Sequence, residues 1–418
     1  MSQKNAFIIV AVVVLALIMA GGLYYYFFLK GTNWEQKFTE SGFVGLFPQG
    51  EEFPPEKKPA GEEGFGSEGE TALQIPKLRH ISEEPIAGAV IIKTSDDKLG
   101  DRIRYVERAT GHIYETYVKS EEKTRISNTT IPKVYEVVWG KGGDELIFRY
   151  LDEDTGEIIS YYAKMSGEKN AEKNITGAFL QKDIYEISAS NDDKLFYLTK
   201  NGSGASGIKS GIDGSGGVEV FSSPITEWLS EWSGKNGIIL KTKPSSVYEG
   251  FVYYLNASNG ALRKILGGIK GLTALANPDV TEIIYSSGAE NSISTFIYNA
   301  EKETRKPFVV KTIPDKCVWS KKEKAIVFCA APEYFPKGEY PESWYQGLIS
   351  FEDKIWKIST EIELGSIIFD SNFYNVSSID AVSLILNADE NYILFTNKKD
   401  YSLWGIDLSP EPVEIIGD

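Results

Sequence analysis

The side chains that most often carry chemistry are scarce in this sequence. It has two histidines, His80 and His112, and two cysteines, Cys317 and Cys329. Serine hydrolase chemistry needs a histidine beside a nucleophile, and neither histidine stands in such a context. Two histidines exclude a three-histidine metal site, and two cysteines exclude a four-cysteine zinc site. The sequence therefore predicts no catalytic residue, no metal site and no cofactor.

Carboxylates are abundant, with 59 Asp and Glu in the chain, but their pattern names no site. Asp192-Asp193 lies in an expected turn, where charged side chains are usually solvated. Asp152-x-Asp154-x-Gly156 resembles the start of a calcium loop, but no glutamate follows at the spacing of an EF-hand. A pair of carboxylates near the centre of the fold, as glycosidases use, stays open as an alternative.

Composition excludes two broad classes of protein. Hydrophobic residues make up 42 % of the chain and aromatic residues 12 %, too many for a disordered protein. The formal net charge of −15 repels phosphate backbones, which argues against a nucleic-acid partner.

The N-terminal segment predicts a membrane anchor. No charged side chain occurs from Asn5 to Leu29, and residues 6–29 are long enough to cross a bilayer as a helix. The alternative is a cleaved signal peptide, whose apolar core is usually shorter. Residues 1–30 are therefore expected to be a single-pass transmembrane anchor. The acidic Pro/Gly-rich residues 31–76 are a predicted flexible linker, with the remaining chain on the extracytoplasmic side of the cell membrane.

The body of the chain repeats one pattern, an apolar strand, a polar turn and a second apolar strand. Equivalent positions fall at residues 139, 189, 232, 275, 319 and 386, at spacings of 50, 43, 43, 44 and 67. Two further short strands follow in each copy, as a four-stranded propeller blade requires. With a less regular copy before residue 139, residues 77–418 predict an all-β, seven-bladed β-propeller. A pair of β-sandwiches is the alternative, but it does not explain the fixed spacing.

A propeller must join its two ends to avoid exposed sheet edges. Leu78–Ser82 has the chemistry of an outer strand with no blade of its own, and we expect it to complete the C-terminal blade. Pro412–Ile416 is the competing segment for that place.

The two cysteines flank one predicted hairpin whose turn is centred on Glu323. Cys317 and Cys329 then face each other across two antiparallel strands, close enough for a disulfide. Two buried free thiols are the alternative. A disulfide would fit an oxidising compartment.

Two long excursions, Lys200–Gly217 and Ala330–Glu352, are expected between the second and third strands of their blades, and so on the same face. The second is rich in aromatic residues that we predict to bind a partner protein. The alternative is that these side chains fold back and cap their own blade. The predicted partner-binding residues are Tyr334, Phe335, Tyr340, Trp344 and Tyr345.

The hairpin that begins Trp319-Ser320, and the later strand Leu403-Trp-Gly-Ile-Asp407, resemble the WD-like repeats of TolB-type propellers. The chain is also similar to membrane-anchored propeller proteins of bacteria. The Gly-His and Trp-Asp dipeptides of standard WD repeats are missing, so the resemblance implies a fold and no partner or catalytic residue.

Together these patterns predict a non-enzymatic, membrane-anchored propeller that acts as a protein-interaction scaffold in a cell-envelope assembly. The alternative is an envelope carbohydrate-binding module or a glycoside-active enzyme with a pocket at the propeller axis.

Overall fold

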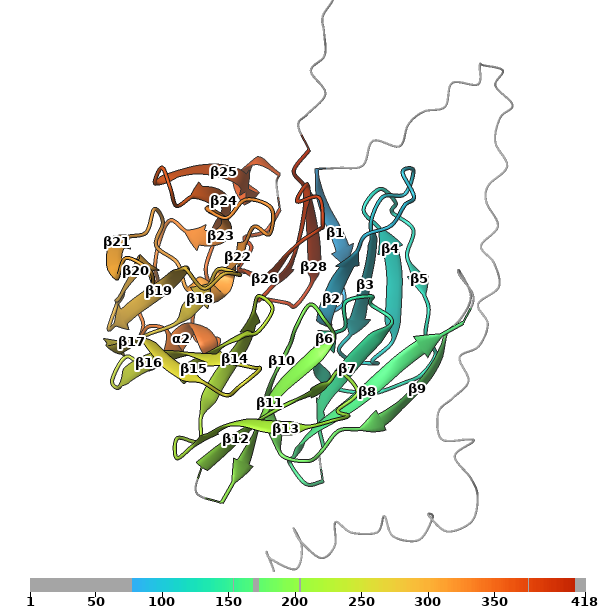
Figure 1. The fold of residues 1–418 in the computed structure, drawn as a ribbon. Coiled ribbons are helices and arrows are strands. Elements are labelled where there is room, and N and C mark those ends of the chain that lie inside the picture. Colours follow the sequence, from blue (N-terminus) through green and yellow to red (C-terminus); the bar gives the residue numbers. More distant parts are fainter. Residues whose placement is uncertain (1–76, 153, 168–172, 203, 375, 410–418) are drawn as a thin grey trace, which may run out of the picture. The chain divides into compact units, whose positions relative to one another are not determined.

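In the computed structural model, the described part of the chain forms twenty-eight strands, arranged in seven four-stranded antiparallel sheets. The sheets follow one another around a ring, which makes the protein a seven-bladed β-propeller and confirms the predicted fold (Figure 1). The structure describes residues 77–152, 154–167, 173–202, 204–374 and 376–409. The predicted anchor at residues 6–29 and the predicted linker at residues 31–76 lie outside the described residues. Within those residues, the search for a helix long and apolar enough to cross a membrane found none.

Each blade is built from consecutive strands, except the last. From the innermost strand outward, blades 1 to 3 are β2 (Ile86–Ile92), β3 (Arg102–Glu107), β4 (Ile113–Tyr117) and β5 (Thr124–Arg125); β6 (Val134–Trp139), β7 (Glu145–Leu151), β8 (Ile158–Ser166) and β9 (Asn174–Phe179); and β10 (Ile184–Ala189), β11 (Lys194–Asn201), β12 (Gly204–Gly211) and β13 (Val218–Ser223). Blades 4 and 5 are β14 (Trp228–Ser233), β15 (Gly237–Thr242), β16 (Glu249–Asn256) and β17 (Leu262–Lys270); and β18 (Ala274–Ala276), β19 (Glu282–Ala289), β20 (Ser292–Asn299) and β21 (Thr304–Pro307). Blades 6 and 7 are β22 (Cys317–Trp319), β23 (Ile326–Pro332), β24 (Asp353–Ser359) and β25 (Leu364–Asp370); and β26 (Ala381–Leu386), β27 (Tyr392–Asn397), β28 (Leu403–Asp407) and β1 (Leu78–Ser82).

Strand direction gives the propeller two different faces. Because neighbouring strands in a blade are antiparallel, the connections between blades and the loops between second and third strands emerge on one side, here called the loop face. The tight turns between first and second strands, and between third and fourth strands, emerge on the opposite side, the turn face. Three short helices, η2 (Pro314–Lys316), α2 (Glu342–Tyr345) and η3 (Ser371–Phe373), lie in connections of the loop face.

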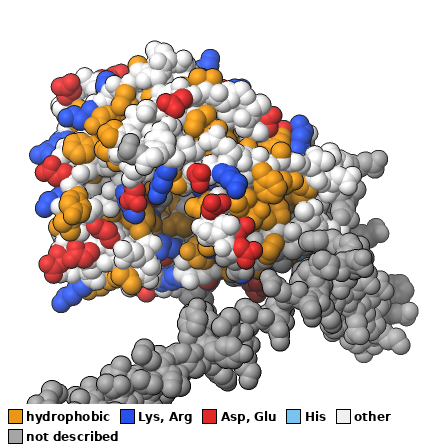
Figure 2. Space-filling model, turned by 90° about the horizontal axis from the view of Figure 1, so that it is seen from below, with side chains coloured by type: hydrophobic (Ala, Val, Ile, Leu, Met, Phe, Trp, Pro, Cys, Tyr) orange, Lys and Arg blue, Asp and Glu red, His pale blue; other side chains and the backbone are white. Residues whose placement is uncertain are grey.

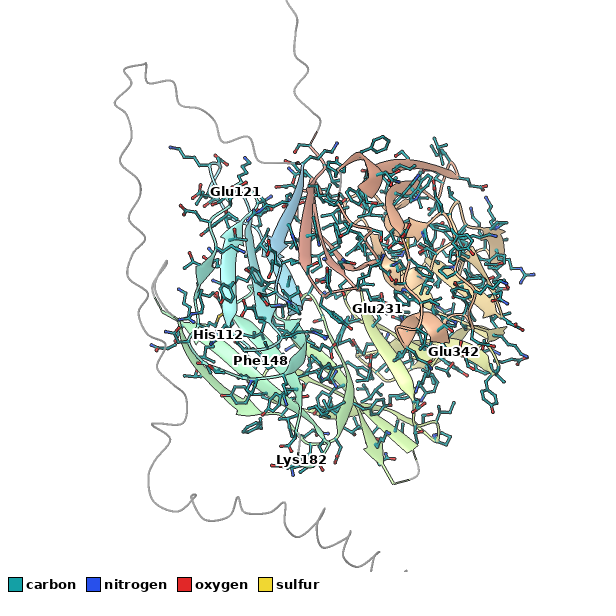
Figure 3. The ribbon with its side chains drawn as sticks, turned by 180° about the vertical axis from the view of Figure 1, so that it is seen from behind. His112, Glu121, Phe148, Lys182, Glu231 and Glu342 are labelled. Carbon is teal, nitrogen blue, oxygen red and sulfur yellow. A yellow bond between two sulfur atoms is a disulfide. The ribbon has the colours of Figure 1, made fainter. Side chains whose placement is uncertain are left out.

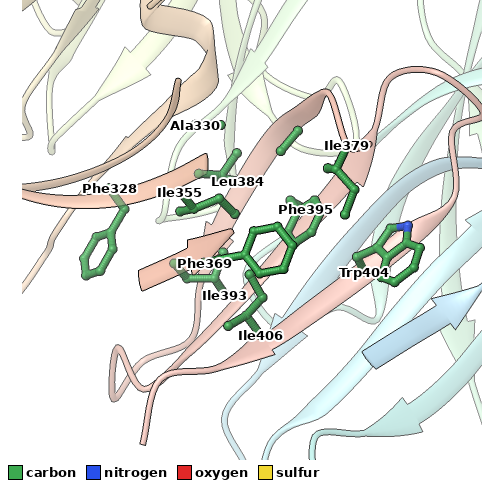
Figure 4. Close-up of a cluster of buried hydrophobic side chains, with 11 residues drawn as sticks. Phe328, Ala330, Ile355, Phe369, Ile379, Leu384, Ile393, Phe395, Trp404 and Ile406 are labelled. Atoms are coloured by element: carbon green, nitrogen blue, oxygen red, sulfur yellow. The ribbon is translucent and has the colours of Figure 1, made fainter. Parts of the chain in front are cut away.

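The hydrophobic core is divided among the seven junctions between blades. The second strands supply continuous apolar runs, such as Leu146-Ile147-Phe148, whose side chains are fully buried. At the junction between blades 6 and 7, Phe328 and Ile355 pack near Leu384 and Phe395 (Figure 4). A four-stranded sheet has two faces to cover, and each blade covers one face of its neighbour, so burial of this surface stabilises the ring as a whole.

The N-terminal strand closes the ring. β1 pairs antiparallel with β28, with Leu78 opposite Ile406 and His80 opposite Trp404. Ile81 is 1 % exposed and packs in the cluster shared by blades 7 and 1. This confirms Leu78–Ser82 as the outer strand of the last blade. The competing segment, Pro412–Ile416, lies outside the described residues.

One predicted excursion is wrong. Most of Lys200–Gly217 is not an insertion, because it contains β12, the third strand of blade 3, and Val218–Ser223 is therefore the fourth strand. Glycine normally weakens a strand, but here it permits close packing. A Cβ atom on Gly207 would lie 2.6 Å from the Phe196 ring, so the strand needs a residue without a side chain at that place.

Candidate functional site

The long loop between β23 and β24 crosses the loop face and contacts several blades. The carboxylate of Glu342, in α2, accepts a hydrogen bond of 2.5 Å from the backbone N–H of Ser246 in blade 4. In blade 5, the Asn291 N–H donates to the carbonyl of Gly338, and the Gly338 N–H donates to the Asn291 side chain. The loop is therefore fixed to its neighbours at both blades and does not project freely.

A buried cation holds the far end of this loop. The Lys316 ammonium is fully buried and pairs with Asp380 and with Asp353, the latter at 2.8 Å. Asp380 also accepts from the Trp344 indole at 3.0 Å and from the backbone N–H of Phe351 at 3.0 Å. Burial raises the pKa of Asp353 to about 6, although Lys316 acts against this shift. Removing one member of such a network would leave an uncompensated buried charge.

These contacts bury some of the five aromatic residues that are predicted to bind a partner and leave others exposed. Tyr340 and Trp344 are buried, at 0 % and 3 % exposure, and Phe335 is half-buried in the same cluster. They pack beneath the loop, so the prediction of a contact surface is wrong for Tyr340 and Trp344. Tyr334 and Tyr345 are 73 % and 39 % exposed and remain available to a partner.

The structure joins Cys317 to Cys329 in a disulfide, the pairing that the hairpin register predicts. Both residues are buried in the junction between blades 5 and 6, and Cys317 directly follows η2. The bond joins the first two strands of blade 6.

Sequence reasoning did not identify a cluster of charged residues at the propeller axis. Its members come from the inner strands of blades 2 to 4, from the second strands of blades 2 and 4, from η2 between blades 5 and 6, and from α2 in the β23–β24 loop. We call the following residues the axial cluster: Glu136, Arg149, Glu186, Glu231, Lys241, Asp315 and Tyr345. Glu231 lies toward the middle of the ring of blades (Figure 3), and Glu342 is the first residue of α2.

In blades 2 and 3, each inner strand places a glutamate near its start. Glu136 accepts a 2.5 Å hydrogen bond from the buried Arg149, whose other amino group donates to the carbonyl of Ile184 in the next blade. Glu186 accepts from the backbone N–H of Ser230 in blade 4 at 2.9 Å. The charged side chains thus connect consecutive blades around the axis.

In blade 4, Lys241 lies between two carboxylates. Its ammonium is 3.4 Å from Glu231 and 3.8 Å from Asp315, and it donates to the carbonyl of Ala274 in blade 5. The Tyr345 hydroxyl donates to the same Asp315. The long loop and the axial cluster are therefore directly connected.

Two carboxyl groups of this cluster hold their protons more tightly than usual. Burial raises the pKa of Glu186 to about 7, partly offset by the hydrogen bond from Ser230 and by nearby Arg149. Burial also raises the pKa of Glu231, against the opposing effect of Lys241. A carboxyl group that titrates near neutral pH can donate or accept a proton under physiological conditions, so Glu186 is suited to general acid–base chemistry.

A cavity of about 440 Å³ adjoins the axial cluster, where the inner strands of blades 7, 1 and 2 meet. Its polar lining includes Arg108, Glu136 and Tyr401, and its apolar lining includes Val382 and Leu394. This volume lies in the range of small-molecule sites.

A repeated dipeptide could have revealed part of the axial cluster. Tyr135-Glu136 and Tyr185-Glu186 stand at the same place in successive copies of the repeat, 50 residues apart. Lys241 and Asp315 follow no such pattern, because one lies in the second strand of blade 4 and the other in the connection between blades 5 and 6. The search for groups of His, Cys, Asp and Glu able to hold a metal ion found none among the described residues.

Comparison with known proteins supports the fold and goes no further. No family model matches the sequence, and no curated protein matches it. Solved structures that are similar in fold include an oligogalacturonate lyase from Vibrio parahaemolyticus, at 11 % identity and a TM-score of 0.46, covering 78 % of this chain and 98 % of that one. TolB from Acinetobacter baumannii has 10 % identity and a TM-score of 0.41, and the match covers 76 % of this chain and 78 % of that one. A puromycin-hydrolyzing peptidase from Mycobacterium tuberculosis has 8 % identity and a TM-score of 0.40, and the match covers 75 % of this chain and 52 % of that one.

These similarities correct one prediction. The sequence was expected to encode a protein that is not an enzyme, yet a lyase and a peptidase are among the structures with a similar fold. At these identities the likeness concerns the fold alone, and no activity is carried over to this chain.

Proposed function

We propose that this propeller is a membrane-tethered scaffold whose loop face binds a folded protein partner in the cell envelope. The observation that carries the proposal is the distribution of exposed hydrophobic side chains. Most of the large ones in the described residues emerge on the loop face, and such side chains gather where proteins bind one another. On the loop face these are Leu151, Phe179, Ile225, Val247, Tyr248, Val309, Tyr334, Tyr345, Leu348, Phe373 and Tyr401.

The rigid seating of the β23–β24 loop supports the same proposal. Tyr334 and Leu348 are each 73 % exposed, and they stand on a loop held by Lys316, Ser246 and Asn291. Exposed apolar groups on an ordered support lose little conformational entropy on binding. On the face that Figure 2 shows, hydrophobic side chains lie among acidic and basic ones.

The path of the chain leaves this face accessible. β1 runs from Leu78 on the turn face to Ser82 on the loop face, since it is antiparallel to β28. The described chain therefore enters the propeller on the turn face. A tether preceding β1 would therefore join the propeller on the face opposite the proposed docking surface.

Site-specific photocrosslinking in intact cells tests the proposal. A photoreactive residue at position 334 or 348 should give a discrete crosslinked product with one partner protein. The matched control places the same residue at position 262 or 364, where exposed leucines lie on the turn face. Equal crosslinking from both faces would contradict the proposal, as would recovery of the full chain in the soluble fraction after cell lysis.

A second function, action on an envelope glycan at the axis, is favoured by one observation. Glu186 combines a pKa of about 7 with a place in the axial cluster beside Arg149. This is the protonation behaviour expected of a general acid. Release of reducing ends from isolated envelope glycans should then fall at least tenfold in Glu186→Gln and stay unchanged in the exposed control Glu121→Gln. Equal release by both variants would exclude this role.

A further inference from the structure

The cavity where blades 7, 1 and 2 meet contains a cation with no anionic partner. Arg108 lines this cavity, and its guanidinium lies 3.8 Å from the centre of the Tyr401 ring. Its Nε donates to the carbonyl of Ile86, and one amino group donates to the carbonyl of Tyr135. Among the residues that the structure describes, no carboxylate forms an ion pair with Arg108, although the chain carries 59 acidic residues.

The other charges near the cavity are already paired. Glu136 is the one acidic residue of the lining, and it is bonded to Arg149 at 2.5 Å. Arg149 lies on the strand behind it and donates also to Ile184. The cavity therefore carries one uncompensated positive charge, which stands in contrast to the net charge of −15 of the whole chain.

The guanidinium is held ready for a ligand. Two carbonyl acceptors and the face of Tyr401 fix its plane, and a guanidinium has more N–H donors than these two bonds use. A fixed arginine with free donors is suited to a planar carboxylate, which can accept two parallel hydrogen bonds. Because the Arg108 guanidinium is already ordered, binding a ligand would cost little of the conformational entropy of this side chain.

The remaining walls determine what must accompany the carboxylate. Val382, Ile385 and Leu394 provide an apolar surface, and Ser383 and Thr396 provide hydroxyl groups. A volume of about 440 Å³ has room for more than a bare anion. We propose that this cavity binds a small organic carboxylate, whose anionic group pairs with Arg108 and whose apolar body packs on the β26 and β27 side chains. The site does not depend on either function proposed above: Glu186 does not line it, and Tyr401 is the one docking-surface residue that it shares.

Isothermal titration of the full chain with three probes tests the ligand class. Benzoate should bind saturably, and benzamide, its neutral relative, should bind at least tenfold more weakly because it lacks the charge. Inorganic phosphate should also bind at least tenfold more weakly, because it gains nothing from the apolar wall. Absence of saturable benzoate binding would overturn the proposal. Benzamide or phosphate binding as tightly as benzoate would overturn it equally.

Two variants locate the site. Arg108→Gln should weaken benzoate binding at least tenfold, whereas Arg125→Gln, an exposed arginine on an outer strand, should leave it unchanged. Ala89→Leu fills the cavity without removing Arg108 and should abolish benzoate binding, which keeps the test valid if Arg108→Gln does not fold. Benzoate binding that is unaffected in a folded Ala89→Leu protein would place the ligand elsewhere and overturn the assignment.

Discussion

The imidazole ring of His80 stacks on the indole ring of Trp404, with the ring centroids 4.0 Å apart and the planes inclined by 7°. His80 lies near the N-terminal end of the propeller domain and Trp404 near its C-terminal end, so this contact joins the two ends of the ring. The stack lies across the β1–β28 pair that closes the propeller. Closure therefore depends on side-chain packing as well as on backbone hydrogen bonds.

We expect the stack to weaken in acid. Burial lowers the pKa of His80 from its usual value of 6.5, so the unfolded chain binds a proton more readily than the folded chain. The contribution of His80 is then present above pH 6.5 and is lost as the pH falls below it. His80→Ala should lower the free energy of unfolding by roughly 0.5–1.5 kcal/mol at pH 8, a typical value for an aromatic pair. Urea titrations at pH 8 and pH 5.5 measure both effects.

The control for this prediction is the other histidine. His112 stands in a turn of blade 1, where its ring contacts the Thr130 hydroxyl. His112→Ala should change the free energy of unfolding at pH 8 by less than His80→Ala does. Equal losses in the two variants would show that the stack on Trp404 has no special role in closure.

Closure by β1 predicts a larger effect from its buried side chain. Ile81 is 1 % exposed and packs with Ile86 and Leu403 between blades 7 and 1. Ile81→Ala should reduce the free energy of unfolding by about 2–5 kcal/mol, as expected for a large-to-small change in a packed core. Leu364→Ala on an exposed outer strand should cost much less. If urea unfolding gave similar values for both, β1 would not be an integral part of the last blade.

The propeller could be predicted from sequence because its signal is repeated. Each copy supplies the same apolar strand, turn and strand, and errors in one copy are corrected by the others. The outer strand Leu78–Ser82 could be placed because it resembles an outer strand but has no blade of its own. The prediction is wrong for Gly204–Gly211, the third strand of blade 3, because its glycines interrupt the apolar pattern that is typical of a strand.

The axial cluster could not be predicted in the same way. Glu186 and Ser230 are 44 residues apart, and Lys241 lies in blade 4 whereas Asp315 lies in the connection between blades 5 and 6. Their proximity follows from how the ring closes and from how strongly each blade twists. Likewise, the burial of Trp344 depends on Lys316 and Asp380, which are remote from it in sequence. Composition alone made this loop look like an exposed contact surface.

The close packing in blade 3 gives a test of the corrected strand assignment. A Cβ atom at position 207 would lie 2.6 Å and 2.8 Å from atoms of Phe196 and 2.9 Å from Phe221. Gly207→Ala should therefore lower the free energy of unfolding by about 1–3 kcal/mol, the usual cost of overpacking. Gly142→Ala is the control, because a Cβ atom there meets nothing within 4 Å. Equal stability of the two variants would contradict the placement of β12 beneath Phe196.

The disulfide predicts a dependence on redox conditions. Non-reducing peptide mapping of the protein isolated from its native source should recover Cys317 linked to Cys329. Reduction should then cost about 2–3 kcal/mol of stability, as expected for a bond that closes a short loop. A Cys317→Ser, Cys329→Ser double variant should lose a similar amount and no longer respond to reductant. Quantitative alkylation of both thiols in unreduced, denatured protein would refute the bond.

The last prediction concerns the axial carboxyl group of Glu186. Burial raises its pKa from 4.5 to about 7, so the folded chain holds a proton that the unfolded chain releases between these values. The free energy of unfolding should therefore fall as the pH rises from about 4.5 to 7. Glu186→Gln removes the titrating group and keeps an oxygen that can accept from Ser230. The free energy of unfolding of this variant should equal that of the wild type at pH 4.5 and exceed it by roughly 1–2 kcal/mol at pH 8. A pKa shift corresponds to about 1.4 kcal/mol per unit. The expected difference is smaller than the full shift would give, because the carboxyl group keeps some contact with water. The exposed Glu121→Gln should follow the wild type at both values. Urea unfolding across this pH range distinguishes the cases. A Glu186→Gln protein less stable than the wild type at pH 8 would mean that Arg149 and Lys241 stabilise the ionised Glu186 in the folded protein, against the proposed effect of burial.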